Sequence, residues 1–156
     1  VAAANVSWIW VLHADGLPSS AAVSQLGGLI EADEPRWGRF NVKIQGLALI
    51  AHMMNLRSRF SRICTGDQGM FFHADLLETI GGFPQQPLME DIEVSRRLKA
   101  AAPSTFVAMR AVVETSPRRW RKAGVVKTVL MMWVYRCRYF LGADPSTLAK
   151  AYYRDE

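Results

Sequence analysis

Two kinds of hydrophobic spacing divide this chain of 156 residues into strands and helices. The continuous apolar run at residues 8–12 predicts a buried strand of a mostly parallel sheet, because strands covered on both faces need no polar alternation. Residues 37–44 alternate apolar and polar positions, which predicts a strand with one solvated face. Shorter apolar segments predict three further strands, at residues 70–72, 105–109 and 111–115.

Apolar positions spaced three and four residues apart predict helices between and after these strands. The predicted helices cover residues 20–31, 47–60, 74–80, 89–101 and 118–140, and a last one starts after Asp144 and Pro145. Strands that alternate with helices are typical of an α/β layer fold. The length of the chain fits one domain better than two.

Composition and charge narrow the function classes. Half of the residues are apolar and 21% are charged, which excludes a disordered or low-complexity chain. A net charge of +5 favours a negatively charged partner, which could be a nucleotide, phospholipid headgroups or nucleic acid. Cys64 and Cys137 have no metal-ligand spacing, so we expect free thiols in a reducing compartment. The longest apolar stretch, residues 123–135, is too short to span a bilayer.

The first candidate for chemistry is the segment His13-Ala14-Asp15-Gly16, directly after the first predicted strand. Open α/β sheets bind ligands at the carboxyl ends of their strands, and Mg²⁺ or Mn²⁺ on a diphosphate needs an exposed oxygen ligand such as Asp15. Asp-Gly pairs also form ordinary turns, so a purely structural interpretation stays open.

The second candidate is the loop Gly66-Asp67-Gln68-Gly69. Its two glycines allow the backbone to approach a ligand closely, and Asp67 and Gln68 supply polar groups at that point. The same two side chains could instead cap the backbone of their own loop.

The third candidate is the acidic start of the helix predicted at residues 89–101. Acids at a helix start interact favourably with the helix dipole, which is a structural interpretation. In the functional interpretation, Asp91 accepts a proton from an attacking hydroxyl group, and Glu90 is the neighbour that orients it.

The fourth candidate is the basic segment from Arg118 to Arg138, which contains seven basic residues and no acid. Arg119 and Trp120 offer a planar fork for phosphate and a flat face for stacking, although a solvated basic helix start is the alternative. Placed on a helix, six apolar residues of this region share one face: Val126, Val129, Leu130, Trp133, Cys137 and Phe140. Such a face could lie at a membrane surface or pack against the protein's own sheet.

Six short segments, taken in order, make the chain resemble the GT-A fold glycosyltransferases of family 2, in particular the small bacterial branch called selenodomain-associated glycosyltransferases. The resemblance covers nearly the whole chain. Its motifs are WVLHAD at residues 10–15, NLRSR at 55–59, GDQG at 66–69, GGFP at 81–84, PLMED at 87–91 and SPRRW at 116–120.

The resemblance implies a metal ligand and a catalytic base. Asp15 would bind the Mg²⁺ or Mn²⁺ of a nucleotide-diphospho-sugar, and His13 stands where the family has its first carboxylate. Asp91 of the pair Glu90 and Asp91 would be the base of an inverting transfer to a hydroxyl acceptor.

The resemblance also implies substrate contacts. Arg119 and Trp120 would lie near the diphosphate or the acceptor, although the Gln that usually precedes this pair is absent here. Asp67 and Gln68 would line the side of the site where sugar and acceptor meet.

The implied fold is a partial GT-A-like three-layer α/β/α sandwich. It would lack the N-terminal nucleotide-binding strands, so we expect this sequence, which begins without Met or a signal-peptide pattern, to be an incomplete and inactive fragment. Residues 1–116 would form the C-terminal part of the catalytic domain, and residues 117–156 would form basic amphipathic helices packed on it. A sheet without its first strands has an unpaired edge, which favours a homo-oligomer.

The leading hypothesis is therefore a cytoplasmic glycosyltransferase at the inner membrane face, with a lipid as one candidate acceptor. The alternative is a non-catalytic membrane-surface or partner-binding module that uses the basic helix 118–138. Nucleic-acid binding ranks below both, because the aromatic residues lie inside apolar runs and form no basic stacking platform. The enzyme hypothesis requires Asp15, Asp91 and Arg119 to converge on one concave site.

Overall fold

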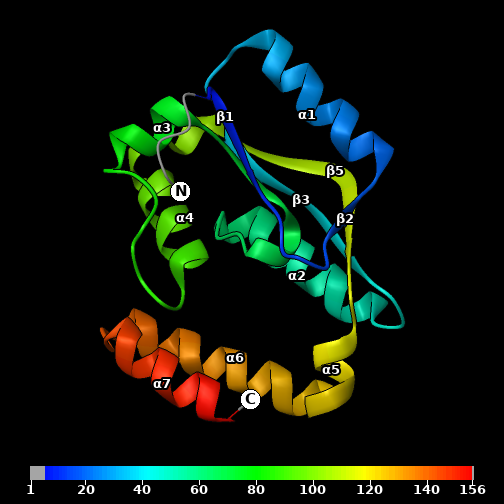
Figure 1. Cartoon of the computed structure of the whole chain (residues 1–156), viewed down its shortest axis with the longest axis vertical. Coiled ribbons are helices and arrows are strands. Elements are labelled where there is room, and N and C mark those ends of the chain that lie inside the picture. Colours follow the sequence, from blue (N-terminus) through cyan, green and yellow to red (C-terminus); the bar gives the residue numbers. More distant parts are fainter. Residues whose placement is uncertain (1–5, 156) are drawn as a thin grey trace. The chain divides into compact units, whose positions relative to one another are not determined.

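The computed structural model describes residues 6–155, and the side chains of Arg119 and Asp155 lie outside the description. The chain divides into two compact units (Figure 1). The first unit comprises the described residues up to Phe83 together with Asp91–Ser116, and the second comprises Pro84–Glu90 together with the described residues from Pro117 onward.

The first unit is built on a curled, mixed sheet of five strands. Their spatial order is β1 (Trp8–Val11), β4 (Met70–His73), β3 (Trp37–Ile44), β5 (Phe106–Thr115) and β2 (Leu17–Pro18). Only β3 and β5 pair in parallel, so the expectation of a mostly parallel sheet is wrong. The first strand is a half-buried edge strand rather than a fully buried one, because β4 is its single neighbour.

Helices cover both faces of this sheet, which confirms the predicted α/β class. On one face, α1 (Ser20–Ala32) packs through Ala22 and Leu26 against Phe40 and Phe71. The Ser19 hydroxyl begins this helix by accepting a hydrogen bond from the Ala22 N–H. On the other face, α3 (Ala74–Thr79) and α4 (Glu90–Ala101) enclose a second cluster of buried residues: Trp37, Cys64, Met70, Phe72, Leu77, Val94 and Leu98.

The central strand β3 has no continuous solvated face, contrary to expectation. Residues 37–40 are all buried, because helices cover both faces of the strand: Trp37 packs in the cluster with α3 and α4, Phe40 packs in the cluster with α1, and α2 (Ala48–Ser61) also contacts the strand. Even Arg39 is fully buried, and its guanidinium donates to the backbone carbonyls of Asn55 and Met109. Burial lowers the pKa of Arg39 to about 10, which still leaves it charged at neutral pH.

The two short strands predicted at residues 105–115 form the single strand β5. Its register against β3 shifts between Arg39 and Asn41, where two positions of β3 face the four-residue step from Ala108 to Val112. This bulge interrupts the apolar pattern at the point where the sequence suggested two strands.

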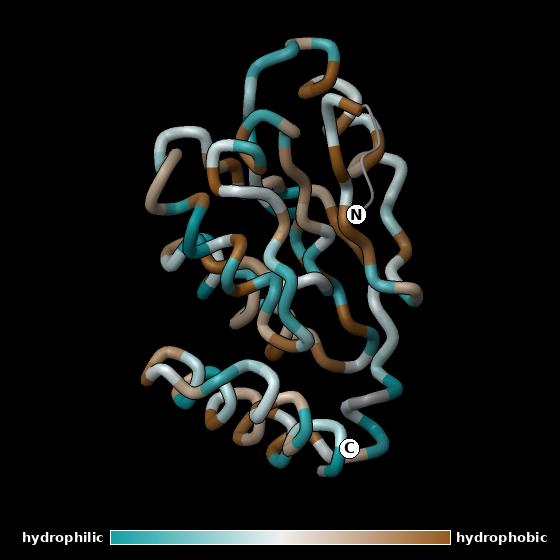
Figure 2. The backbone as a smooth tube through the Cα atoms, turned by 60° about the vertical axis from the view of Figure 1, so that its left-hand side comes forward, coloured by the Kyte–Doolittle hydropathy of each residue, from teal (hydrophilic) through white to brown (hydrophobic). Residues whose placement is uncertain are grey.

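The second unit is helical, with α5 (Arg118–Ala123), α6 (Val125–Phe140) and α7 (Pro145–Asp155). The expected continuous helix from 118 to 140 is wrong, because Gly124 takes a positive φ of 83° and separates α5 from α6. Tyr135, Leu148 and Tyr152 form the core of this unit. Figure 2 shows hydrophobic and hydrophilic positions alternating along these helices. Among the described residues, no helix has the length and apolarity needed to cross a membrane.

Candidate active site

The candidate site begins with an ion pair between His13 and Asp67. His13 lies just beyond the carboxyl end of β1, and Asp67 lies in the 3₁₀ turn Gly66–Gln68 just before β4. The antiparallel register places Val11 opposite Met70, so the end of one strand meets the approach to the other. The Nδ1 atom of His13 is 2.9 Å from the Oδ1 atom of Asp67.

The start of α4 joins this pair through Asp91. The Oδ2 atom of Asp91 accepts the Gly66 N–H at 3.1 Å, and its Oδ1 atom accepts the Ile92 N–H at 2.7 Å. Two backbone donors therefore hold the carboxylate in one orientation. Three segments far apart in the sequence thus meet at the end of β1.

Gly66 is required for this meeting. A Cβ atom at this position would lie 2.2 Å from the Nε2 atom of His13, so any larger residue would displace the imidazole ring. Sequence reasoning identified the loop but not this role of Gly66. The available signal was a glycine directly beside an acid, which is too common to be decisive.

The electrostatics agree with the convergence of the three segments. The hydrogen bond to Asp67 raises the pKa of His13, while partial burial opposes the shift. The charges of Asp67, Asp91 and Asp15 raise the pKa of His13 further. Asp15 is exposed in the turn that the Gly16 N–H closes onto the His13 carbonyl at 2.9 Å. Carboxylates from three segments therefore act on one imidazole.

The side chain of Gln68, which was predicted to bind substrate, instead forms hydrogen bonds inside the protein. It is fully buried, and its amide donates to Ser58 Oγ at 2.9 Å and to Asn55 Oδ1 at 3.2 Å. The amide of Asn55 also bonds both the N–H and the carbonyl of Val42. The inward side of the loop thus holds α2 to β3, and Asp67 is the outward residue.

The remaining predicted residues lie in the second unit. Trp120 is 8% exposed, so little of its ring is accessible for stacking on a substrate. Glu90 begins α4 and is half-buried. Arg119 lies in α5, and its side chain is outside the described residues.

The two predicted metal ligands, His13 and Asp15, have different surroundings. Within the described part of the chain, no three His, Cys, Asp or Glu residues form a group that could hold a metal ion. The Nδ1 atom of His13 faces Asp67, which leaves Nε2 as the ring nitrogen that could bind a metal ion. Asp15 fits as a single exposed carboxylate, which Mg²⁺ accepts when a diphosphate supplies further oxygens.

No protein family, curated protein or solved structure matches this chain. The functional argument therefore depends on the residues of the site.

Proposed function

We propose that the protein is a GT-A-like glycosyltransferase that moves a sugar, with inversion, from a nucleotide-diphospho-sugar to a hydroxyl acceptor. The observation that carries the proposal is the convergence of His13, Asp67 and Asp91 at the carboxyl end of β1. In open, mostly parallel α/β sheets, ligands bind at the carboxyl ends of the strands, and β1 runs in the same direction as the parallel pair β3 and β5. The order of the six short sequence segments is independent support.

Asp91 is the proposed general base. Its carboxylate accepts the proton of the acceptor hydroxyl while that oxygen forms a bond to the anomeric carbon. The bond from the anomeric carbon to the diphosphate oxygen breaks, and the electron pair leaves with the nucleoside diphosphate. The N–H groups of Gly66 and Ile92 orient the base for this transfer.

His13 is the proposed cation beside this base. The ion pair with Asp67 fixes its ring, and the protonated ring would place one positive charge near the departing diphosphate. Asp15 is the proposed protein ligand of a Mg²⁺ or Mn²⁺ ion, which when bound would neutralise charge on the diphosphate.

Transfer from a panel of nucleotide-sugars tests the proposal, and the longest natural form of the protein that contains these residues should be used. Asp91→Asn keeps an acceptor oxygen for the Gly66 N–H but removes the basic carboxylate. We expect a rate loss of about 10²–10⁴-fold, the range for loss of a general base.

Glu31→Gln is the matched control, because Glu31 is an exposed acid on α1. Its activity should equal that of the wild type. Full activity in Asp91→Asn would remove Asp91 as the base. A folded wild type that transfers no sugar from any donor in the panel would refute the proposal as a whole.

A further inference from the structure

The apolar face of α6 (Val125–Phe140) is largely exposed. Val126, Leu130, Trp133 and Val134 are exposed to 73%, 60%, 58% and 55%. Phe140 and Leu141 at the end of the helix are exposed as well. At 100° per residue these positions fall within one arc of about 120°.

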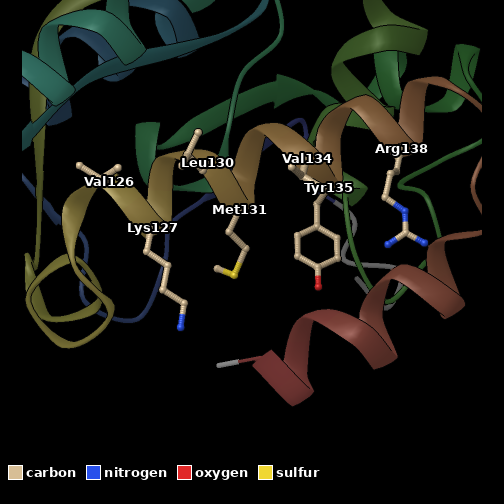
Figure 3. A pocket seen from close by; sticks show the side chains of 7 residues that line it. All are labelled: Val126, Lys127, Leu130, Met131, Val134, Tyr135 and Arg138. Carbon is tan, nitrogen blue, oxygen red and sulfur yellow. The ribbon is translucent and has the colours of Figure 1, made fainter.

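The opposite face of the helix explains why this arc is free. Thr128 and Tyr135 are buried on that side, and Tyr135 packs in the core of the unit with Leu148 and Tyr152 of α7. Figure 3 shows Val126, Leu130 and Val134 projecting on one side of α6, away from Lys127 and Met131. An open groove of about 550 Å³ follows the helix between these two rows.

Cations border the apolar arc. Lys127 and Arg138 lie along one edge of it, both are exposed, and neither has an acidic partner among the described residues. The segment from Arg118 to Arg138 contains no acid at all. An exposed apolar arc bordered by cations alone is complementary to a surface with an apolar interior and anionic headgroups.

From this arrangement we propose that α6 binds in the plane of an anionic lipid bilayer, with its apolar arc among the acyl chains and Lys127 and Arg138 at the phosphate level. Trp133 is the one exposed tryptophan of the five in the chain, and tryptophan favours the membrane interface. The proposal does not depend on the glycosyltransferase activity.

One other helix serves as an internal comparison. On α2, Leu49, Met53, Leu56 and Phe60 are also exposed along one side. That helix has no tryptophan, and its apolar arc is only about 60° wide. Substitutions on α2 therefore remove exposed apolar side chains of similar size at a place where we expect no membrane contact.

Vesicle co-sedimentation of the full chain tests the proposal. The vesicles contain either phosphatidylcholine alone or an equimolar mixture of phosphatidylcholine and phosphatidylglycerol. We expect binding to the mixed vesicles only, and roughly tenfold or more weaker binding for Leu130→Gln/Val134→Gln. Leu49→Gln/Met53→Gln should bind as the wild type does.

A second pair of variants tests the role of charge. Lys127→Gln/Arg138→Gln removes the two cations beside the apolar arc. Lys99→Gln/Arg110→Gln is the control, because it has the same net charge and its two residues are exposed in the first unit. We expect the first pair to lose about tenfold or more in binding, and the control pair to lose less. Lipids with nitroxide-labelled acyl chains should quench a fluorescence component that Trp133→Phe removes.

Three results would overturn the proposal. The first is equal binding by the α6 variants and the wild type, and the second is loss of binding in the α2 variant instead. The third is an absence of vesicle binding together with an oligomer that Leu130→Gln/Val134→Gln dissociates, because the arc would then be covered by a second copy of the chain. Circular dichroism of each variant shows that the helices are retained.

Discussion

At the scale of single residues, the site depends on how close the backbone at position 66 comes to His13. The imidazole lies where the side chain of any other residue would begin, and the Gly66 N–H is a donor to Asp91. One small residue therefore permits two contacts of the proposed site. This relation is invisible in the sequence, because His13 and Gly66 are distant along the chain.

Gly66→Ala should separate activity from stability. The added methyl group must push the His13 ring toward solvent, which is cheap for a half-exposed side chain but breaks the geometry with Asp67. We expect the transfer rate to fall roughly tenfold or more, in line with the effect of small misplacements, and the melting temperature to change little.

Gly28→Ala is the matched control, because a Cβ atom at that position in α1 has no neighbour within 4 Å. It should keep full activity and stabilise the fold by about 0.5–1 kcal/mol, since alanine favours a helix. If Gly66→Ala retains full activity, the contact with His13 has no role in the site.

The two cysteines should differ sharply in reactivity. Burial raises the pKa of the Cys64 thiol to about 12, so almost no thiolate forms there at neutral pH, whereas Cys137 is exposed. A disulfide reagent should therefore modify one thiol in the native protein and two in denaturant. Rapid modification of both thiols in the folded protein would contradict the burial of Cys64.

At the scale of elements, the side chain of Asn55 forms the hydrogen bonds that a neighbouring strand would otherwise form with Val42. Strand β4 pairs with only the first two residues of β3. The backbone of Val42 therefore has no strand neighbour on the side of β3 where β4 lies. The Asn55 amide accepts the Val42 N–H at 2.8 Å and donates to its carbonyl at 2.9 Å. A single side chain from α2 thus satisfies the backbone N–H and carbonyl of Val42 on the side that β4 does not reach.

Asn55→Ala should destabilise the fold. It leaves the Val42 N–H and carbonyl without partners and removes an acceptor from Gln68. We expect a loss of about 1–3 kcal/mol for each backbone group left unsatisfied, measured by urea denaturation. Gln45→Ala, at an exposed position after β3, should change stability by less than about 0.5 kcal/mol. An equal effect of the two substitutions would remove this role from Asn55.

The elements themselves were largely predictable from local spacing, whereas their pairing was not. Apolar runs located β1, β3 and β4, and helical spacing located α1 and α2, because each of these patterns is local. Strand order and direction depend on contacts between distant segments, such as Trp8 opposite His73, which no local pattern encodes. Likewise, the alternation in β3 could not reveal that α2 buries Arg39.

The candidate site was predictable in its residue types but not in its partners. His13, Asp67 and Asp91 follow from acids and glycines at the ends of predicted elements. Gln68 has the same local signal as Asp67, yet the 3₁₀ turn directs it inward to Ser58. The backbone conformation of the turn determines which of the two adjacent polar side chains faces solvent, and the spacing of residues in the sequence does not reveal it.

At the scale of the whole molecule, the two units differ in the charged residues that they group together. The first gathers the carboxylates of Asp15, Asp67 and Asp91 around one imidazole. The second contains the segment from Arg118 to Arg138, which has seven basic residues and no acid. The proposed acid–base chemistry and the proposed attraction to an anionic surface therefore involve different units, and each is tested by its own variants.

The most direct test of the central claim, that separate segments build one site, is an NMR titration of the His13 ring. The account predicts a pKa above the usual value near 6.5, with the largest fall in Asp67→Asn, a smaller fall in Asp91→Asn and no change in Glu31→Gln. The same pKa in the wild type and in all three variants would contradict it, because His13 would then be distant from both carboxylates.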